Sequence, residues 1–167
     1  TTSGFDVNAL LIQGGGTICG ALDVTGAPIT VEACSADAGT LTANVNPVQF
    51  TGGSLTISAT QATAPTVPAN YDVAYVLTSG AGLVIEVTSA TPSFDVTSAG
   101  LYTIHTLVAE TTDSNDPNFL DLSVVVPGTT TGVDVLNLVT SNGLCAALDV
   151  TGAPITIEAC TADAVAL

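Results

Sequence analysis

The sequence predicts an all-β domain, and three observations predict it. Small and β-branched residues, serine and glycine dominate the composition and aromatic residues make up 4%, which is typical of strand-rich proteins. Short apolar runs alternate with threonine and serine at the two-residue period of a strand. Glycine-containing turns separate these runs at intervals of roughly 8–12 residues. Together these features indicate a β-sandwich of immunoglobulin-like type.

The expected strands follow one another along the middle of the chain. In residues 54–60, Leu55, Ile57 and Ala59 alternate with threonine and serine, and therefore mark one buried face. Residues 62–70 contain two prolines and are predicted to be a loop. In chain order, the predicted strands are 40–44, 48–51, 54–60, 71–77, 83–88, 93–97 and 101–108.

Two short helices are predicted, at residues 6–13 and 133–140. Val7 and Leu10 have helical spacing and recur as Val133 and Leu136, so we expect these positions to form the buried face. Glycines follow both segments and would end the helices. A strand is the alternative for either segment.

A long segment occurs twice. Residues 19–34 recur as residues 145–160 with two substitutions, at a shift of 126 positions. One full period of a repeat and part of a second copy favour a tandem array. We therefore expect residues 1–38 to end one module with a short helix and hairpin, residues 39–164 to form the next complete module, and residues 165–167 to start another.

The repeated segment contains a Thr-Gly-Ala-Pro turn between two strand-like runs, which predicts a β-hairpin. In such a hairpin Cys19 would lie opposite Cys34, because both are equally far from the turn centre. The predicted disulfides are then Cys19–Cys34 and Cys145–Cys160. The rival pairing joins Cys34 to Cys145 and brackets one whole module. Either pairing indicates an oxidising, extracellular location.

The charge of the chain excludes several classes of partner. It has no lysine or arginine against 15 acidic residues, a net charge of −15. Nucleic acids need basic side chains to displace their counterions, so no nucleic acid is expected as a partner. No apolar run reaches the roughly 18 residues of a membrane span, so no membrane insertion is expected either.

One acidic loop has the composition of a calcium site. Calcium takes oxygen ligands from carboxylates, amides and carbonyls. The spacing is not that of an EF-hand, and a solvated turn is the alternative, so we expect no required cofactor and treat Ca²⁺ as a hypothesis. The candidate ligands are Asp113, Asn115, Asp116, Asn118 and Asp121.

Nothing in the sequence predicts an enzyme. His105 is the single histidine, and its position within an apolar run indicates a structural strand residue. No nucleophile motif accompanies it, and chemistry that depends on lysine or arginine has no residues to use. The repeated carboxylates Asp23 and Asp149, and Glu32 and Glu158, are interpreted as structural. No catalytic residue is predicted.

Residues 71–80, 92–96 and 100–108 resemble Ig-like and PKD-like modules. The run Gly-x-Tyr-Thr-Ile-His-Thr-Leu-Val, followed by Thr-Thr-Gly-x-Asp-Val and the cysteine segment, is similar to the tandem repeats of very large Bacteroidota surface proteins, among them gliding adhesins of the SprB type. The resemblance implies an exported, cell-surface-attached repeat of an adhesin or fibre, without catalytic residues. Its partners would be neighbouring copies and a surface or glycan ligand that the sequence does not identify.

Two other functions remain open from the sequence. The chain could be a filament subunit in which residues 1–38 complete a neighbour's sheet by strand addition. It could also be a carbohydrate-binding sandwich, although tryptophan is absent and there are three tyrosines, which leaves few platforms for stacking sugars.

Overall fold

The computed structural model describes residues 26, 27, 29 and 33–160. The chain divides into two units, Thr1–Ala33 and Cys34–Leu167, and the elements described below belong to the second. They are β1 (Thr40–Ala43), β2 (Val48–Phe50), β3 (Leu55–Thr63), β4 (Asp72–Ser79), β5 (Val84–Ser89), β6 (Ser93–Val96), β7 (Gly100–Ala109), the 3-10 helix η1 (Leu122–Val124), α2 (Gly132–Asn142), β8 (Ala147–Leu148) and β9 (Ala153–Ala159). The predicted helix at 6–13, Cys19 and residues 165–167 lie outside the described residues.

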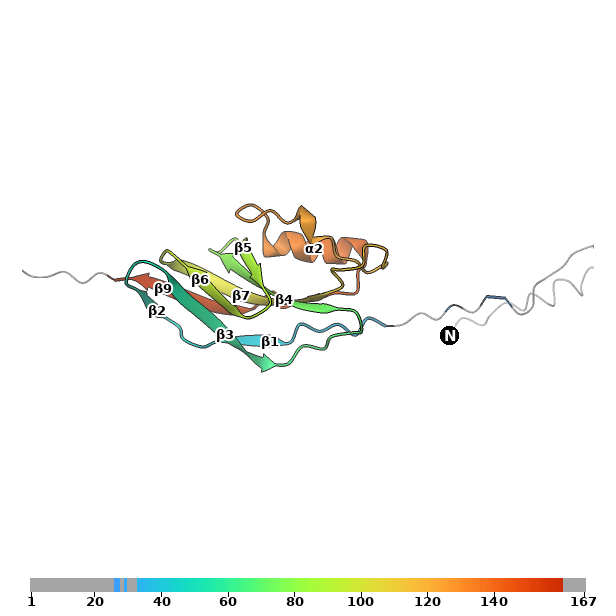
Figure 1. Ribbon diagram of the computed structural model, residues 1–167, viewed down its shortest axis with the longest axis horizontal. Coiled ribbons are helices and arrows are strands. Elements are labelled where there is room, and N and C mark those ends of the chain that lie inside the picture. The colour runs from blue at the N-terminus through green and yellow to red at the C-terminus, as the bar shows by residue number, and fades with distance from the viewer. Residues whose placement is uncertain (1–25, 28, 30–32, 161–167) are drawn as a thin grey trace, which may run out of the picture. The chain divides into compact units, whose positions relative to one another are not determined.

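The strands form two sheets, which confirms the predicted β-sandwich. The smaller sheet has the order β1-β3-β6, and the larger has the order β2-β9-β7-β4-β5, with β8 also paired to β7. The pairs are antiparallel except for β2, which runs parallel to β9. Figure 1 shows helix α2 on the side of the larger sheet that faces away from β1 and β3. The module therefore has three layers, of which the sequence predicted two.

The main core lies between the two sheets. The alternation in β3 places Ile57 and Ala59 inward, as the sequence predicted, with exposures of 3% and 5%. From the larger sheet, β9 contributes alternate residues from Ala153 to Ile157. The buried members of this core are Leu41, Ile57, Ala59, Tyr75, Leu77, Phe94, Val96, Tyr102, Ile104, Ala153, Ile155 and Ile157.

A second core lies between the larger sheet and α2. Its buried members are Val76, Ile85, Leu107, Ala109, Leu120, Val135 and Val139. Strand β7 is therefore covered on both faces, and its residues from Tyr102 to Ala109 are all buried. A strand covered on both faces buries consecutive residues, and in β7 the buried residues include three polar ones, Thr103, His105 and Thr106.

Helix α2 is confirmed, with clear start and stop signals. Thr131 and Asp134 form a reciprocal capping box at its N-terminus, and Gly143 ends it in the left-handed conformation at φ 63°. The predicted buried face was wrong. Val135 and Val139, one turn apart, are buried, whereas Val133 is 53% exposed. The helix thus turns Val135 and Val139 toward the second core, and not the face of Val133 and Leu136 that the sequence predicted.

Candidate functional site

The repeated segment 145–160 pairs with β7 along most of its length, in two strands that are separated by a short unpaired stretch. Strand β8 pairs with β7 at Leu107 and Val108, and β9 pairs with β7 from Gly100 to Ile104. Both pairings are antiparallel, so β8 and β9 run in the same direction along the same edge of β7. Residues 149–152 bulge out between them. The whole segment therefore lines β7 from one end to the other.

The predicted hairpin in this segment is wrong, because its two strands pair with β7 and not with each other. The Thr151-Gly152 pair lies in the bulge and does not reverse the chain. Gly152 has φ 57°, and a Cβ atom there would lie 2.6 Å from the carbonyl oxygen of Ile104. Such a close approach admits only glycine. The equivalent Gly26 of the first copy has φ 55°.

His105 holds this bulge in place. Its Nδ1 donates to the carbonyl oxygen of Asp149 at 2.8 Å, so Nε2 is the acceptor and receives the hydroxyl proton of Thr78 at 2.9 Å. Burial lowers the pKa of His105, and the hydrogen bond to Asp149 offsets this in part. Both ring nitrogens are used, which supports the interpretation of His105 as a structural residue.

Asp149 completes the bulge with its carboxylate. Its Oδ1 accepts the backbone N–H groups of Thr151 and Gly152 at 3.2 and 3.0 Å, and its own N–H donates to the carbonyl oxygen of Thr106 at 2.9 Å. These contacts agree with the interpretation of the repeated aspartate as structural. Glu158 is also engaged structurally, since it accepts a hydrogen bond from the side chain of Gln49.

Cys34 and Cys145 form a disulfide with a Cα–Cα distance of 5.2 Å. The predicted pairs Cys19–Cys34 and Cys145–Cys160 are therefore wrong, and the rival pairing that brackets one module is confirmed. The physical reason is that the segment forms no hairpin. Strands β8 and β9 lie one after the other along β7, so Cys145, before β8, and Cys160, after β9, lie at opposite ends of the segment. Cys160 is exposed and is the free cysteine of the described region.

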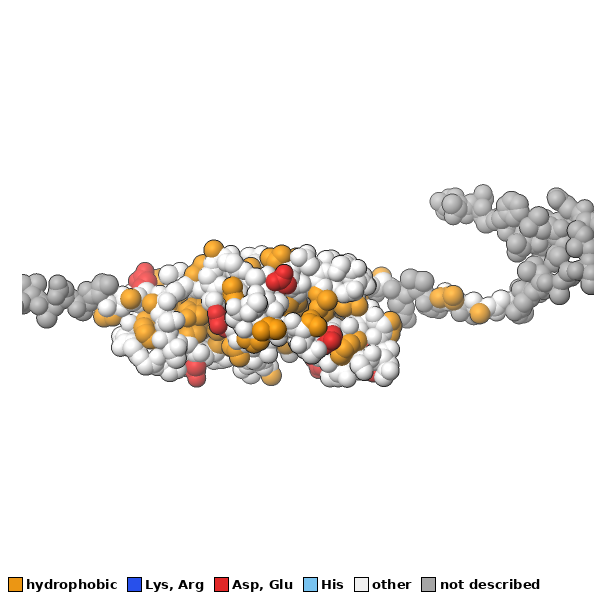
Figure 2. All heavy atoms as spheres, turned by 90° about the horizontal axis from the view of Figure 1, so that it is seen from above, with side chains coloured by type: hydrophobic (Ala, Val, Ile, Leu, Met, Phe, Trp, Pro, Cys, Tyr) orange, Lys and Arg blue, Asp and Glu red, His pale blue; other side chains and the backbone are white. Residues whose placement is uncertain are grey.

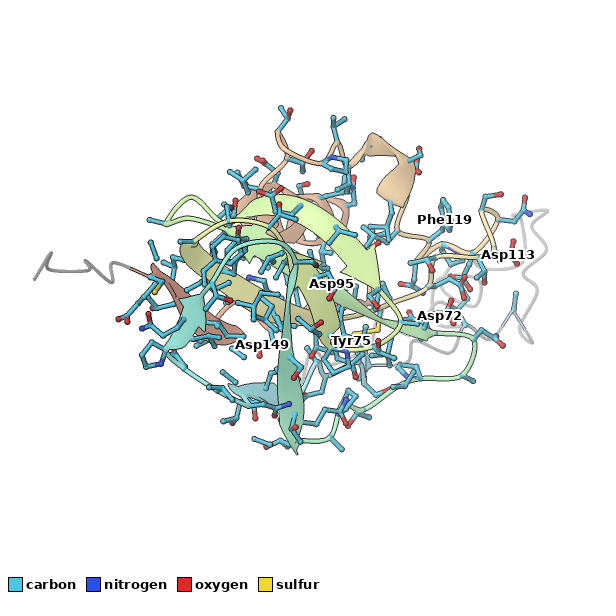
Figure 3. All side chains as sticks on the ribbon, turned by 60° about the vertical axis from the view of Figure 1, so that its left-hand side comes forward. Asp72, Tyr75, Asp95, Asp113, Phe119 and Asp149 are labelled. Carbon is cyan, nitrogen blue, oxygen red and sulfur yellow. A yellow bond between two sulfur atoms is a disulfide. The ribbon has the colours of Figure 1, made fainter. Side chains whose placement is uncertain are left out.

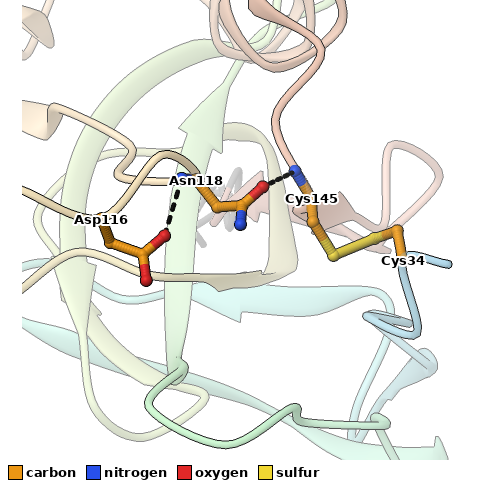
Figure 4. Close-up of a disulfide and its surroundings, with 4 residues drawn as sticks. All are labelled: Cys34, Asp116, Asn118 and Cys145. Atoms are coloured by element: carbon orange, nitrogen blue, oxygen red, sulfur yellow. Dashed lines mark hydrogen bonds between the residues drawn. A yellow bond between two sulfur atoms is a disulfide. The ribbon is translucent and has the colours of Figure 1, made fainter. Parts of the chain in front are cut away.

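The disulfide is tied to the loop that precedes η1. The backbone N–H of Cys145 donates to Oδ1 of Asn118 at 3.0 Å, and the N–H of Asn118 donates to Oδ1 of Asp116 at 2.7 Å, as Figure 4 shows. Asn118, a predicted calcium ligand, thus orients the chain at the disulfide. Sequence reasoning gave no signal for this contact, because it links residues 27 positions apart.

The candidate calcium ligands are engaged in separate local turns. Asp113 accepts from the backbone of Asn115 at 3.0 Å, and Asp121 caps η1 by accepting from Ser123 at 2.9 Å. Hydrogen bonds from Ser123 hold the pKa of Asp121 below its usual range. In Figure 3, Asp113 and Asp149 lie on different parts of the module. Within residues 33–160 no three His, Cys, Asp or Glu side chains gather around a metal-sized space.

Glu110, just before this loop, fixes its start. Its Oε1 accepts the N–H of Asp113 at 2.8 Å and the N–H and hydroxyl of Thr112 at 2.6 and 2.7 Å. These hydrogen bonds lower the pKa of Glu110. The carboxylate of Glu110 thus holds the backbone at the start of the loop. Calcium binding stays a prediction, which a calcium-dependent rise in melting temperature would support.

A cavity of about 340 Å³ opens between the larger sheet and α2. Its floor includes Val76 and Leu107, and Val133 and Leu136 form part of its helical wall. The polar groups in its lining are Thr78, Glu86, Thr88 and His105, and Thr78 and His105 are already bonded to each other. Most of the remaining lining is apolar, and Thr78 and His105 are 0% and 3% exposed.

Carboxylates stand singly on the face seen in Figure 2, with apolar side chains between them. No helix in the described part of the chain is both long and apolar enough to cross a membrane. Comparisons of the chain with protein-family models, curated proteins and solved structures found no match.

Proposed function

We propose that the chain is a non-enzymatic structural repeat of a long extracellular adhesin or surface fibre, of the kind carried by very large Bacteroidota surface proteins, in which it acts as a stalk or filament module. The observation that carries this proposal is the disulfide between Cys34 and Cys145. It closes one module within a single sequence period of 126 residues, so each copy would carry its own covalent closure. Disulfides persist in oxidising compartments, which supports an exported location.

The disulfide also decides which part of the module carries tension. A pull on the chain before Cys34 and after Cys160 passes from Cys34 through the disulfide to Cys145. The residues between the two bonded cysteines, which are separated by 111 positions, are bypassed. Tension then runs through residues 145–160 alone. This segment is called the strap below.

The strap is suited to bearing tension along its length. Its contacts with β7 extend from Val108 to Gly100, a span of about 27 Å at about 3.4 Å per residue. Strand β9 lies between β7 and β2, so it is hydrogen-bonded on both sides. Because neither β7 nor β2 lies on the path of tension, these hydrogen bonds hold the strap to its sheet without carrying the pull themselves.

A strand-adding filament subunit is less well supported. Residues 1–33 are equivalent to residues 127–159, which supply α2, β8 and β9 of the module. That place is already filled by the module's own chain. A donated segment would therefore have to displace a strand whose Ile155 and Ile157 are 0% and 2% exposed.

Carbohydrate binding also finds little support in the described region. Sugar sites in sandwich modules use exposed aromatic rings as stacking platforms. Tyr75 and Tyr102 are buried in the main core, and Tyr102 donates its hydroxyl proton toward Ser98. Tyr71 is the remaining tyrosine of the sequence.

Localisation and size together test the proposal. An antibody raised against the module should label intact, unpermeabilised cells, and the denatured and reduced antigen should be far larger than the 16.4 kDa of this chain. Labelling that requires permeabilised cells would contradict the surface location. A reduced species of 16.4 kDa would contradict the tandem array and favour a filament of subunits.

Force spectroscopy on the native protein tests the mechanical role. With the disulfide intact, detaching a strap should release a short extension, because at most the 16 residues from 145 to 160 become extended. With reductant, each module should release about 380 Å of additional extension, because the 111 residue steps between Cys34 and Cys145, at about 3.4 Å each, then also bear the tension. Equal extensions with and without reductant would show that the disulfide does not bypass the sheets.

A further inference from the structure

The boundary between consecutive modules falls immediately before a cysteine. The second compact unit of the chain starts at Cys34, and the repeat makes Cys160 the equivalent position of the following copy, 126 residues later. Independently, β9 ends at Ala159. The boundary at Cys34, carried forward by one sequence period, thus coincides with the end of β9. The inference that follows rests on the proposed tandem array.

Very little chain separates the boundary cysteine from the first fixed contact of its module. Asp37 exchanges two backbone hydrogen bonds with Thr66, at 3.0 and 2.9 Å. Its Oδ1 also accepts the N–H of Gly39 at 2.8 Å, and Ala38 is 6% exposed. Only Ser35 and Ala36 lie between this bridge and Cys34.

The second copy has Asp163 and Ala164 at the positions of Asp37 and Ala38, whereas Val165 stands at the position of Gly39. From Cys160 to Asp163 there are three residue steps, which span at most about 11 Å. If Asp163 makes the bridge that Asp37 makes here, the first fixed contact of the following module lies within that distance of Cys160.

The main chain of Cys160 belongs to the preceding module. Its N–H donates to the carbonyl oxygen of Phe50 at 3.2 Å, which extends the parallel pairing of β2 and β9 by one residue. Its thiol is exposed and unbonded. The equivalent sulfur, that of Cys34, is bonded to Cys145.

The geometry points to Cys160 as a boundary residue that is fixed in two modules at once. Its N–H is bonded to β2 of the preceding module, and its sulfur forms the disulfide of the following module with the cysteine 126 positions beyond Cys145. In that step two thiols lose two protons and two electrons, and one S–S bond forms. The electrons pass to a protein disulfide by thiol–disulfide exchange, or to molecular oxygen.

The consequence is a continuous covalent path through the array. Tension would pass from a disulfide to a 16-residue strap and then to the next disulfide. The other strands and the helix of each module would be attached to this path and would carry none of the tension. Because the residue that ends one strap also closes the next module, successive modules would bend little at their junction.

Disulfide mapping of the full-length protein tests this inference. The native protein is alkylated, digested without reductant by a protease that cleaves after glutamate, and analysed by mass spectrometry. Cleavage after Glu158 produces a peptide that starts at Ala159, and Thr161 distinguishes it from the Cys34 peptide, which has Ser35. We expect this peptide to be linked to one that contains the equivalent of Cys145. Recovery of Cys160 alkylated, linked to Cys19, or capped by a small thiol would overturn the inference.

The same digest separates this inference from the proposed array. A peptide that starts at Ala159 and continues past Leu167 into a second copy of the β1 region shows a tandem array, whatever the state of Cys160. If that peptide is found with an alkylated Cys160, the result supports the tandem array and contradicts the proposal that Cys160 is bonded to the following module. If the peptide ends at Leu167, the array falls as well.

Discussion

The imidazole Nδ1 of His105 lies 2.8 Å from the carbonyl oxygen of Asp149, so a side chain of the central strand fixes the bulge in the strap. Burial depresses the pKa of His105 below 6.5 in the folded module. Between the folded pKa and 6.5 the unfolded chain therefore binds more protons than the folded one. We expect the free energy of unfolding to fall as the pH is lowered from 7 through this window.

Chemical denaturation between pH 7.5 and pH 5 measures this dependence. The slope can reach at most about 1.4 kcal/mol per pH unit, the value for one proton. His105→Gln should be less stable at pH 7.5 and should lose the slope, because the sequence has no other histidine. A slope that persists in His105→Gln would assign the effect to other groups.

Two buried threonines on neighbouring strands are expected to respond in opposite ways to the same substitution. The hydroxyl of Thr106 is the one buried side-chain polar atom without a partner in the described part of the chain. Thr106→Val keeps the shape and removes that hydroxyl, so the free energy of unfolding should rise by about 1 kcal/mol.

Thr78 is the matched control, because it is equally buried and donates to Nε2 of His105. Thr78→Val should lower the free energy of unfolding by about 1–3 kcal/mol, since it leaves a buried ring nitrogen unpaired. Urea denaturation of both variants at pH 7.5 makes the comparison. Destabilisation by Thr106→Val would mean that its hydroxyl has a partner in solution.

Local pattern was sufficient for the strands and for helix α2. The alternation of Leu55, Ile57 and Ala59 predicted a strand with one buried face, and β3 has that face. The predicted helix at 133–140 lies within α2. Its buried face could not be read from the repeated residues, because the second core that selects Val135 and Val139 is built from β4, β5 and β7.

The strap was beyond local reasoning. A Thr-Gly turn between two strand-like runs fits a hairpin and a bulge equally well, and the choice depends on His105 and Ile104, more than 40 positions away in sequence. Once the hairpin was assumed, the symmetric placement of Cys145 and Cys160 favoured the wrong disulfide. The 126-residue period does not decide the pairing, because it sets no module boundary. A period counted from Cys34 contains Cys34 and Cys145, whereas one counted from residue 39 contains Cys145 and Cys160.

The bulge predicts a strong dependence on Gly152. A Cβ atom there would lie 2.7 Å from Cγ2 of Thr103 and 2.8 Å from Nδ1 of His105, in addition to the contact with Ile104. Gly152→Ala should therefore cost more than 3 kcal/mol in the free energy of unfolding, roughly the sum of left-handed strain and overpacking.

Gly143 isolates the backbone contribution. It also has φ near +60°, but a Cβ atom there would meet nothing within 4 Å. Gly143→Ala should cost about 1–2 kcal/mol, the strain of a left-handed alanine alone. Thermal or urea denaturation of the two variants gives the difference. Equal losses would mean that the strap can move away from β7.

The disulfide predicts a clear ranking of cysteine variants of this chain. Cys34→Ser and Cys145→Ser each remove a bond that closes a loop of 111 residues. Loop entropy gives an upper estimate of about 5 kcal/mol for such a loop, and native disulfides typically contribute about 2–4 kcal/mol. The double variant should be no less stable than either single one, because all three lose the same bond.

Cys160→Ser should leave the free energy of unfolding within about 0.5 kcal/mol of the parent, since its thiol is exposed and unbonded in this chain. Urea denaturation without reductant measures the four variants, and the same series with reductant should bring the parent down to the level of Cys145→Ser. A loss in Cys160→Ser as large as that in Cys145→Ser would instead require these two cysteines to be bonded to each other, and with that bond the strap could not run straight along β7.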